Sequence, residues 1–556
     1  MRMSDINNRI SKCSKYILPA VLIIVLVLYV RVCFFQLIFF DDDAIILRDY
    51  NRIDKIEKII PAFGNNYLDG HYYRPLTSIS FILDAFVSGQ IPWSYHITNI
   101  LIHAAVVTLL YYLLITMGYP KVAAGPAVIL FAISPLQLNS VAWIAGRADL
   151  LVCFFSLSSF LLFLKFRISL KLLRIPLIAF LLICAFFSKE SALIIPFLII
   201  FYLFLERKIP GRTGANFLFT AVLLALIVLY FQWRVMLIEK IAIEKIVLSN
   251  IAVTFRIIPE TIAKFFVPFG IKALPDFTPV LSSAGAFMAS ILFIIPFLLK
   301  KINRKRYYFG FLWFLVLMMP GLLFRTNPLD KFYYWDCRSY LPAVGLVIMV
   351  SELLSVIIKE HVRFCDFGFI SLYFMILFCG SVYYMGYYRN ALSFWGSVKS
   401  DYPERYLPHV GLYKYYTHTG QKAEAEFHII KAIDLCPGNV VNREYLFDYY
   451  VYKNEPNKAF LVASEGLKLN ANELPLIRDL INSAILLNKV ELLDPYIFGT
   501  SRSTEQKQQL KKVLREETSS LKGFVTGTIY SALITRIGKL ESIIQSDSTT
   551  MPETAR

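Results

Sequence analysis

Apolar runs long enough to cross a bilayer recur through the first 390 residues, and they constrain the fold more than any other feature. The first run, Tyr16 to Phe40, is about 25 residues long, enough for a helix to cross a hydrocarbon core of about 30 Å. Because lipid offers no hydrogen bonds, backbone groups inside it must pair within the chain, so these runs should form helices. The further runs lie at about 95–117, 122–135, 150–166, 175–188, 192–205, 216–234, 283–299, 307–324, 340–358 and 367–388. The sequence thus predicts an all-α, polytopic membrane domain with about eleven spans.

Basic residues are distributed as a fixed membrane orientation requires. Arg2, Arg9, Lys12 and Lys15 precede the first span and acidic residues follow it, which places the N-terminus in the cytoplasm. Basic clusters recur at every second link, and an odd number of spans then leaves the C-terminal region outside. The net charge of +17 therefore reflects topology and does not indicate nucleic-acid binding. The first run is too long for a removable signal peptide and lacks a small-residue cleavage site.

Two stretches of this domain are more polar than the spans. Residues 41–92 form an expected external loop, in which amphipathic pieces at 54–62 and 77–87 could lie along the membrane interface. Residues 235–282 fit a loop, an interfacial helix or a re-entrant pair, and the sequence leaves these three open.

After the last apolar run the chain becomes charged and helix-forming, with a repeat period of 34 residues. Large residues early in each unit and small ones later allow two helices to pack closely, as in tetratricopeptide repeats. The aligned positions are Leu412 with Leu446, Tyr416 with Tyr450, Ala425 with Ala459, and Ala432 with Gly466. We therefore predict a membrane domain over 1–390, a tetratricopeptide-repeat-like helical domain over 391–545, and a disordered tail over 546–556.

Metal-binding patterns are weak in this sequence. The eight cysteines are scattered, mostly within apolar runs, and no CxxC or Cys/His cluster occurs, so neither a disulfide framework nor a zinc site is expected. No cofactor is firmly predicted. A divalent cation between two adjacent carboxylates is retained as a minor alternative.

Polar side chains gather at the predicted outer ends of several spans, where charged groups are costly and usually either paired or functional. Three aspartates, Asp41, Asp42 and Asp43, directly follow the first run, and His71 and Arg74 lie in the loop beyond them. A solvated helix end is the simpler explanation for the aspartates. The other polar groups predicted on the same side of the membrane favour a functional explanation for the aspartates.

A histidine-rich face begins the next span. His96, Asn99 and His103 are spaced by three and four residues, so they share one side of a helix. Interhelical hydrogen bonding is the structural alternative to a functional role for this trio.

Two more clusters follow at outer span ends. Arg147 could meet a phosphate while Asp149 fixes its orientation, and Lys189 with Glu190 forms a similar pair after a later span. A purely structural ion pair is the alternative for each. The last external segment contains Arg325, Lys331, Asp336 and Arg338.

A rim of carboxylates, histidines and fixed cations suits glycosyl transfer from a lipid phosphate. A carboxylate would take the acceptor's hydroxyl proton while cations stabilise the departing phosphate. Because a phosphate leaves more readily than an alcohol, one well-placed base can suffice without an acid catalyst.

The motifs in order also resemble a known family. FDDD, YRPL, YHITNILIH, GRADLL, SKE and DCRSYLP, followed by the repeats, are similar to the transmembrane and tetratricopeptide repeat-containing O-mannosyltransferases and their bacterial relatives. These are GT-C superfamily membrane glycosyltransferases, so the resemblance implies a GT-C-like membrane domain. The similarity covers most of residues 35–200, part of 310–345 and the repeats.

The resemblance assigns expected roles to residues of this chain. It implies that Asp41 and Asp42 include the catalytic base. Arg147, Asp149, Lys189 and Glu190 match the family's GRAD and KE positions, and Arg338 matches its late arginine. In our hypothesis Arg147, Lys189 and Arg338 bind the donor phosphate, and the supporting positions are Asp149, Glu190, His71, Arg74, His96, Asn99 and His103. The chain departs from the family at Ser134 and Asn139, where relatives often have a histidine and a glutamate, and this affects sugar specificity, any metal and activity.

The leading hypothesis is an inverting, GT-C-type glycosyltransferase that moves a sugar, mannose by the resemblance, from a polyprenyl-phosphate donor to a hydroxyl. The acceptor would be an extracytoplasmic protein or glycan, bound in part by the repeats. Compact loops and a short repeat array suggest a bacterial inner-membrane protein with a periplasmic repeat domain. One alternative is a transporter or flippase for lipid-linked sugars, which would need charged groups on both sides of the membrane or along a central path. Another is a membrane-anchored repeat scaffold for envelope assembly.

Overall fold

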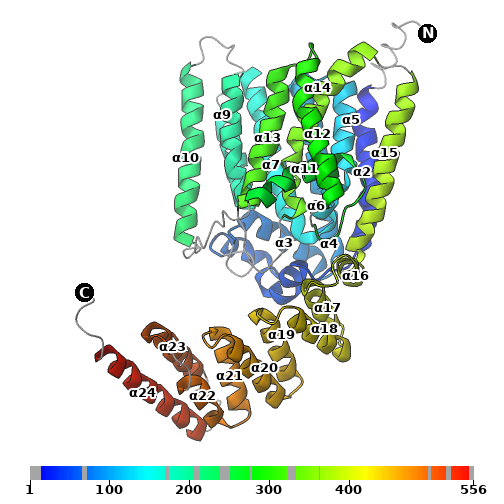
Figure 1. Cartoon of the computed structure of the whole chain (residues 1–556). Helices are drawn as coiled ribbons and strands as arrows, with labels where there is room; N and C mark the ends of the chain where they lie inside the picture. The colour runs from blue at the N-terminus through cyan, green and yellow to red at the C-terminus, as the bar shows by residue number, and fades with distance from the viewer. Residues whose placement is uncertain are drawn as a thin grey trace. The chain divides into compact units, whose positions relative to one another are not determined.

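The computed structural model describes residues 14–65, 72–168, 174–205, 213–237, 251–275, 278–323, 334–361, 364–498, 502–520 and 527–549. Contacts divide the chain into two compact units, Met1–Val398 and Lys399–Arg556, called here the N-terminal and the C-terminal unit. The regular elements of the described ranges are helices, which confirms the all-α prediction (Figure 1). The predicted domain boundary at residue 390 lies at the start of α16 (Ala391–Asp401), and the division of the chain into two units falls within this helix.

Most helices of the N-terminal unit run side by side, whereas α3, α6 and several short helical turns of residues 44–63 gather at one end (Figure 1). Each predicted apolar run overlaps one of these helices, because its composition favours helix wherever it is buried in lipid or protein. The helices are α2 (Ile17–Tyr29), α3 (Pro75–Ser88), α4 (Trp93–Thr116), α5 (Lys121–Ile133), α6 (Leu138–Ala142), α7 (Arg147–Ile168), α8 (Arg174–Ser188), α9 (Ile195–Leu205), α10 (Thr213–Leu237), α11 (Ile251–Phe266), α12 (Pro279–Leu298), α13 (Arg304–Leu323), α14 (Ala343–His361) and α15 (Phe364–Met385).

Several of these helices have the length and composition of membrane spans, so the unit is a membrane domain. Within the described residues, five helical segments are long and apolar enough to cross a bilayer. They are Ile17–Phe34, Trp93–Thr116, Ile144–Lys165, Pro279–Leu298 and Gly368–Arg389, and the bent pair formed by α5 and Pro135–Ala142 makes a sixth if it is one span. Shorter apolar helices such as α3 and α8 accompany them. The count of eleven spans stays a prediction.

The sequence around Ser134 and Pro135 breaks a helix and turns the chain. A residue before proline is pushed out of the helical region, and Ser134 accordingly has φ −60° and ψ 131°. The helical axis bends by 50° at this break. The Ser134 hydroxyl donates to the carbonyl of Phe265 in α11 at 3.1 Å. The expected continuous span at 122–135 is therefore a helix followed by a sharp turn.

Glycines allow close helix crossings in this unit. A Cβ on Gly345 of α14 would lie 2.3 Å from the carbonyl oxygen of Gly310 in α13, and the reverse contact would be 2.7 Å. A Cβ on Gly285 of α12 would meet the carbonyl oxygen of Pro259 in α11 at 1.9 Å. Small residues at such crossings let membrane helices gain van der Waals contact along their backbones.

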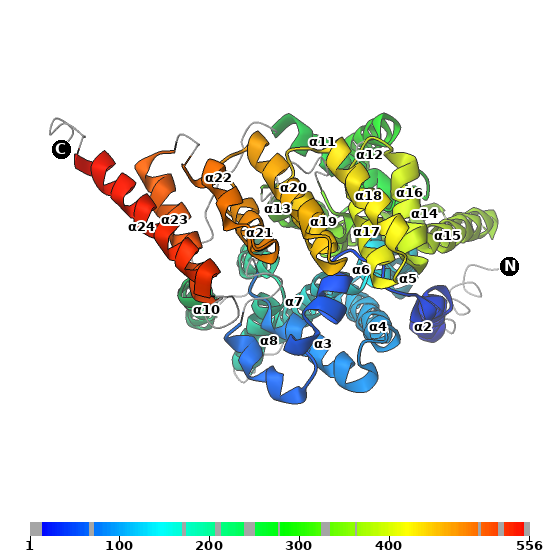
Figure 2. The same cartoon turned by 90° about the horizontal axis from the view of Figure 1, so that it is seen from below.

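The C-terminal unit is built from successive helices that stack in chain order (Figure 2). They are α17 (Leu407–His418), α18 (Lys422–Leu435), α19 (Val440–Tyr452), α20 (Pro456–Leu469), α21 (Leu474–Leu486), α22 (Asp494–Phe498), α23 (Thr504–Ser520) and α24 (Gly527–Thr549). The first two hairpins coincide with the two predicted 34-residue units, although their identity as tetratricopeptide repeats stays a prediction. Helix α24 continues to Thr549, beyond the expected start of the tail, and residues 550–556 lie outside the described ranges.

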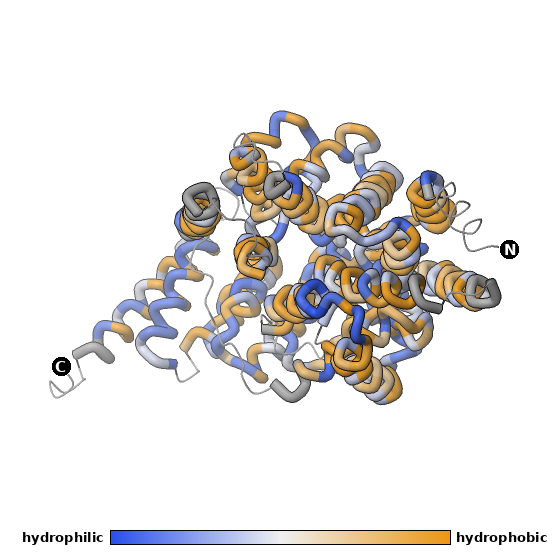
Figure 3. The backbone as a smooth tube through the Cα atoms, turned by 90° about the horizontal axis from the view of Figure 1, so that it is seen from above, coloured by the Kyte–Doolittle hydropathy of each residue, from blue (hydrophilic) through white to orange (hydrophobic). Residues whose placement is uncertain are grey.

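The hairpins are packed by the residues that the period singled out. Ala425, Ala432 and Ala459 are fully buried, and Leu446 is 6% exposed. In the hydropathy view (Figure 3) the helices near the C-terminus mix polar and apolar residues along their length, whereas those of the N-terminal unit are mostly apolar. Each hairpin therefore buries only one side of each helix.

Candidate functional site

The three aspartates lie in a tight turn beyond the first span. The helical run ends at Phe34, six residues before the predicted end at Phe40, and the chain then extends. Phe39 and Asp41 both have left-handed backbones, with φ of 58° and 65°. Such conformations cost energy for residues with a side chain and cluster at functional sites.

The Asp42 side chain holds this turn together. Its carboxylate accepts backbone N–H groups from Ile38 at 2.8 Å, Phe40 at 2.9 Å and Asp43 at 3.0 Å, and only 2% of the residue is exposed. Burial and, second, the charge of Asp43 raise the pKa of Asp42 to about 7 against the opposing effect of the three backbone donors. Asp41, the preceding residue, is exposed.

An aromatic cluster anchors the turn to distant parts of the chain. Phe40 stacks on Trp143 with ring centroids 5.1 Å apart and also lies 4.9 Å from Trp335. The indole N–H of Trp143 donates to the Phe40 carbonyl at 2.7 Å, and that of Trp395 donates to the Ile38 carbonyl at 2.7 Å. The position of the aspartates therefore depends on α16 as well as on the segment before α7.

Arg147 is a fully buried clamp at the start of α7. Its guanidinium contacts the carboxylate of Asp84 at 2.7 Å and the carbonyl of Tyr95 at 2.7 Å, and it donates to the side-chain oxygens of Asn99 and Ser80. No part of Arg147 is exposed. The expected orientation by Asp149 is not observed, because residues two apart on a helix do not face each other.

Asp149 instead pairs with Lys189, whose ammonium lies 2.6 and 2.7 Å from the two carboxylate oxygens. Glu190 binds the guanidinium of Arg74 at 2.9 Å, and a second guanidinium, from Arg234 on α10, lies 3.9 Å away. Lys189 has an extended backbone with φ −163°, so its side chain and that of Glu190 diverge toward different partners. Both pairs are partly exposed.

The polar face of α4 is buried against its neighbours. The Asn99 amide donates to the carbonyls of Val141 at 3.3 Å and Trp143 at 3.1 Å. His103 shares hydrogen bonds with the Tyr340 hydroxyl at 2.5 Å and the Ala132 carbonyl at 3.2 Å. Asn99 and His103 thus make the interhelical bonds that were the structural alternative. His96 is 1% exposed, and His71 lies outside the described residues.

These bonds connect the predicted groups at one end of the bundle. Trp143 binds Phe40 of the acidic turn through its indole and binds Asn99 through its carbonyl, and Asn99 in turn binds Arg147. The acidic turn, the GRAD segment and α3 are therefore joined by a continuous hydrogen-bond network.

The segment before α14 adds a buried ion pair that sequence reasoning missed. Lys264 of α11 lies 3.0 and 3.2 Å from the carboxylate oxygens of Asp336, and both side chains are more than 90% buried. Arg256, Glu260 and Lys264 recur at four-residue spacing, a signal that could have identified one polar helix face within 235–282.

Arg338 lies beside this pair and donates to the Gly321 carbonyl at 3.1 Å. Burial and, second, the charge of Asp149 raise the pKa of the Cys337 thiol to about 12, against the lowering effect of Lys189 and Arg338. Asp149, Lys189 and Arg338, three of the predicted site residues, therefore all lie close enough to affect the pKa of this one thiol. The predicted cations Arg325 and Lys331 lie outside the described residues.

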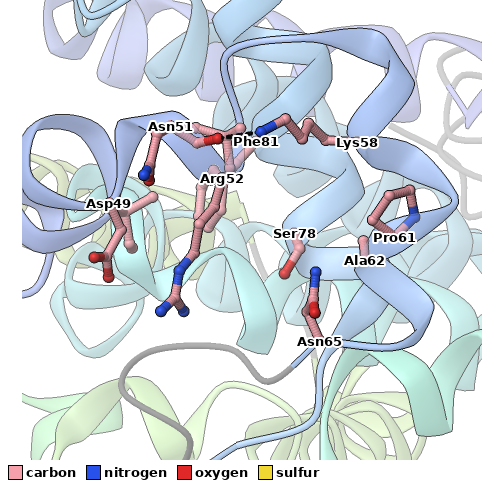
Figure 4. Close-up of a pocket in the computed structure, with 11 residues that line it drawn as sticks. Asp49, Asn51, Arg52, Lys58, Pro61, Ala62, Asn65, Ser78 and Phe81 are labelled. Carbon is pink, nitrogen blue, oxygen red and sulfur yellow. Dashed lines mark hydrogen bonds between the residues drawn. The ribbon is translucent and has the colours of Figure 1, made fainter.

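A pocket of about 230 Å³ lies next to the acidic turn, between residues 45–65 and one face of α3 (Figure 4). Asp49, Arg52, Asn65 and Ser78 are among its polar lining residues, and Phe81 is among the apolar ones. Within the described ranges, no cluster of three or more histidine, cysteine, aspartate or glutamate side chains has the arrangement of a metal site.

Comparison with known proteins gives a partial match. Human protein O-mannosyl-transferase TMTC2 is 42% identical over 96 residues, which is 17% of this chain and 11% of the relative. Mouse TMTC1 is 38% identical over 90 residues, 16% of this chain and 10% of the relative, and Drosophila melanogaster Tmtc1 is 29% identical over 121 residues, 22% and 14%. The chain is similar to the TMTC protein O-mannosyl-transferases. The match covers only about a tenth of each relative's length.

Other comparisons add nothing to this TMTC similarity: no family model and no solved structure matches the chain. The two expected departures from the TMTC pattern are both buried. Ser134 bonds to α11 as described, and the Asn139 amide donates to the Tyr388 hydroxyl at 3.0 Å. Both side chains therefore stabilise the bend between α5 and α6 in this TMTC-like chain.

Proposed function

We propose that this chain is a membrane glycosyltransferase that moves a sugar, mannose, from a polyprenyl-phosphate donor to a hydroxyl of an extracytoplasmic polypeptide or glycan. The O-mannosyl-transferase activity for which the TMTC relatives are named and the membrane character of the N-terminal unit support this proposal. The observation that carries it is the strained acidic turn, which presents one exposed carboxylate and is joined by hydrogen bonds to the buried Arg147 and Asp84 pair.

Asp41 is the general base in this proposal, and Asp42 positions it. The Asp42 carboxylate accepts hydrogen bonds from three backbone N–H groups, so its removal would destabilise the turn. Asp41 is exposed and held in a conformation that the free chain would disfavour. Pre-organisation of this kind aligns a base with its substrate before the reaction begins.

The reaction is a single displacement. The acceptor oxygen bonds to the anomeric carbon as the bond from that carbon to the phosphate oxygen breaks, which inverts the configuration. Asp41 takes the hydroxyl proton, and the phosphate leaves with the electron pair. Lys189 and Arg338, both only partly buried, are the proposed phosphate-binding cations, and buried Arg147 positions α3 and α4 around them.

The orientation is part of the same proposal. The N-terminus would be cytoplasmic, the acidic turn would face the periplasm of a bacterial cell, and the C-terminal unit would present the acceptor polypeptide. A stack of helical hairpins offers an extended surface for such a chain.

Substitution of each aspartate alone tests the assignment. The full chain in lipid nanodiscs is given polyprenyl-phosphate [³H]mannose and an acceptor peptide mixture from the same cells. Asp41→Asn should lower kcat by about 10²–10⁴-fold, as expected for loss of a general base, with an unchanged melting temperature. Asp42→Asn should lower both kcat and melting temperature, and Glu57→Gln, an exposed acid of the same loop, should change neither.

If Asp41→Asn transferred the sugar at the wild-type rate, the assignment of Asp41 as the general base would be wrong. Donor translocation across sealed vesicles without any transfer product would instead favour the transporter alternative.

A further inference from the structure

We propose that the pocket between residues 45–65 and α3 binds one uncharged sugar residue. The proposal rests on the proposed function only for the source of that sugar, since the pocket itself is defined by its lining. It begins directly after the acidic turn: the backbone N–H of Ile45, a lining residue, donates to the Asp41 carbonyl at 3.1 Å. A ligand in the pocket would therefore lie against the same short segment that positions Asp41.

The polar lining is mixed in charge, which favours a neutral polyol. Asp49, Arg52, Asn51, Asn65 and Ser78 supply a carboxylate, a guanidinium, two amides and a hydroxyl (Figure 4). Carboxylates, guanidinium groups and amides each have two hydrogen-bonding positions that can engage neighbouring hydroxyl groups together. Asp49, whose carboxylate also lies 3.5 Å from the exposed guanidinium of Arg48, would oppose a phosphate, and Arg52 would oppose a cationic peptide side chain.

One further cation of the lining is turned away from this role. The ammonium of Lys58 donates to the Asn51 carbonyl at 2.6 Å and lies 3.7 Å from the Asp54 carboxylate. Figure 4 shows the first of these bonds as a link within the loop. Lys58 therefore shapes the loop, and the excess of positive charge available to a ligand is small.

The pocket also has apolar lining residues that are buried. Phe81 is fully buried in α3, and the Arg147 guanidinium lies 4.9 Å from its ring centroid. Ile53 and Ala62 are also buried lining residues. The C–H face of a sugar ring packs well on such a surface, and the buried clamp around Arg147 fixes the position of Phe81.

Size and access limit the ligand further. A volume of about 230 Å³ is below the roughly 300–1,000 Å³ of sites for drug-sized molecules, so one ring fits better than an oligosaccharide or a lipid. Asn51, Arg52, Pro61 and Asn65 are exposed, so the pocket is open at the surface of the unit. The sugar is either the terminal residue of an acceptor glycan or the transferred residue of the donor.

Binding of simple sugars to the full chain tests the site without any transfer reaction. Methyl α-mannoside and methyl α-glucoside are titrated into the protein in lipid nanodiscs, and saturation-transfer NMR reports ligand contact. Arg52→Ala and Asn65→Ala should each weaken binding about tenfold, the loss expected for one or two hydrogen bonds, one of them charge-assisted. Lys55→Ala removes a positive charge from an exposed position of the same loop outside the lining and should leave binding unchanged.

The transfer assay then separates the two sources. If the bound sugar belongs to the acceptor, Arg52→Ala raises the KM for a glycosylated acceptor. If the bound sugar belongs to the donor, the same substitution raises the KM for polyprenyl-phosphate mannose. Absence of saturation transfer from either glycoside to wild type, or equal signals in wild type and both pocket variants, would overturn the sugar site. Asp41→Asn keeps glycoside binding while losing transfer, so failure of the base assignment and failure of the pocket are distinguishable.

Discussion

Two ion pairs of equal length show how differently the two units treat charge. Arg147 and Asp84 in the N-terminal unit lie 2.7 Å apart with 0% and 6% of their side chains exposed. Lys453 and Glu426 in the C-terminal unit are also 2.7 Å apart, but 22% and 23% of their side chains are exposed. The distance between the charges therefore does not determine how much each pair contributes to stability. That contribution depends on how far burial has removed each charge from water.

The difference extends to how each unit is held together. The N-terminal unit buries ion pairs and hydrogen-bonded polar side chains between its helices at one end, including Lys264 with Asp336. The core of the C-terminal unit is an apolar cluster of alanine, leucine, isoleucine and aromatic residues. Substitutions of charged groups should therefore damage the first unit most, and substitutions in the second should act through packing and titration.

The largest effect is expected from Arg147→Leu. It would leave the Asp84 carboxylate buried without its partner, which typically costs about 3–5 kcal/mol, whereas Lys453→Ala should cost about 1 kcal/mol or less. Thermal unfolding in detergent micelles compares the two variants. The double variant Arg147→Leu/Asp84→Leu should recover part of the loss because no unpaired charge remains. Equal melting temperatures for Arg147→Leu and Lys453→Ala would contradict the comparison.

Close packing in the membrane unit gives the next effect. A Cβ on Gly345 would lie 2.3 Å from the Gly310 carbonyl oxygen and 2.6 Å from the Phe314 nitrogen, both of which are backbone atoms. Gly345→Ala must therefore push α13 and α14 apart, at a cost of about 1–3 kcal/mol. Gly368→Ala on α15 adds the same methyl group where nothing lies within 4 Å, and should be neutral. The same melting assay reads both, and a neutral Gly345→Ala would show that this crossing tolerates separation.

A buried histidine pair makes the C-terminal unit sensitive to acid. His409 and His428 are 4% and 5% exposed, and their Nδ1 atoms lie 2.9 Å apart. Burial and nearby charges lower the pKa of each to about 4. After burial, the charges of Lys399 and Lys431 act on His409, and those of His409 and Lys399 act on His428. The unfolded chain binds protons near pH 6.5, so this contribution to stability is complete above pH 6.5 and is lost as the pH falls toward 4.

Hydrogen exchange of the full chain locates this loss. After correction for intrinsic exchange rates, protection of residues 407–435 should fall by about 1–2 kcal/mol between pH 6.5 and 4.5. The double variant His409→Leu/His428→Leu should lose this pH dependence. His418→Gln, at an exposed position of the same hairpin, should keep it. Equal pH dependence in wild type and the double variant would show that other groups are responsible.

The secondary structure could be predicted from the sequence wherever it depends on local composition. Apolar runs predicted helices because their composition acts over each segment by itself, and the 34-residue period placed two hairpins. It failed at Phe34, where the helix ends early because Asp42 caps a left-handed turn that Trp143 and Trp395 anchor from far along the chain. No local signal reports an anchor of that kind.

Which charged residues pair with each other could likewise be predicted only in part from the sequence. That Asp149 could not orient Arg147 was readable from the sequence, because positions two apart point to different sides of a helix. That Asp84 would take its place was not readable, since the two residues are 63 positions apart. The pairing of Lys264 with Asp336 across 72 positions likewise needs the fold.

The smallest effect should come from the pair formed by Arg515 of α23 and Glu541 of α24. Their side chains make a direct contact but are 56% and 33% exposed, so water already solvates both charges in the folded and the unfolded chain. Lys511 lies 3.7 Å from the same Glu541 carboxylate and would keep part of the interaction. Arg515→Ala should therefore change stability by less than about 0.5 kcal/mol, and raised salt should leave the wild-type melting temperature almost unchanged. A loss as large as that of Arg147→Leu would mean that contact distance governs both units after all, and that burial does not separate them.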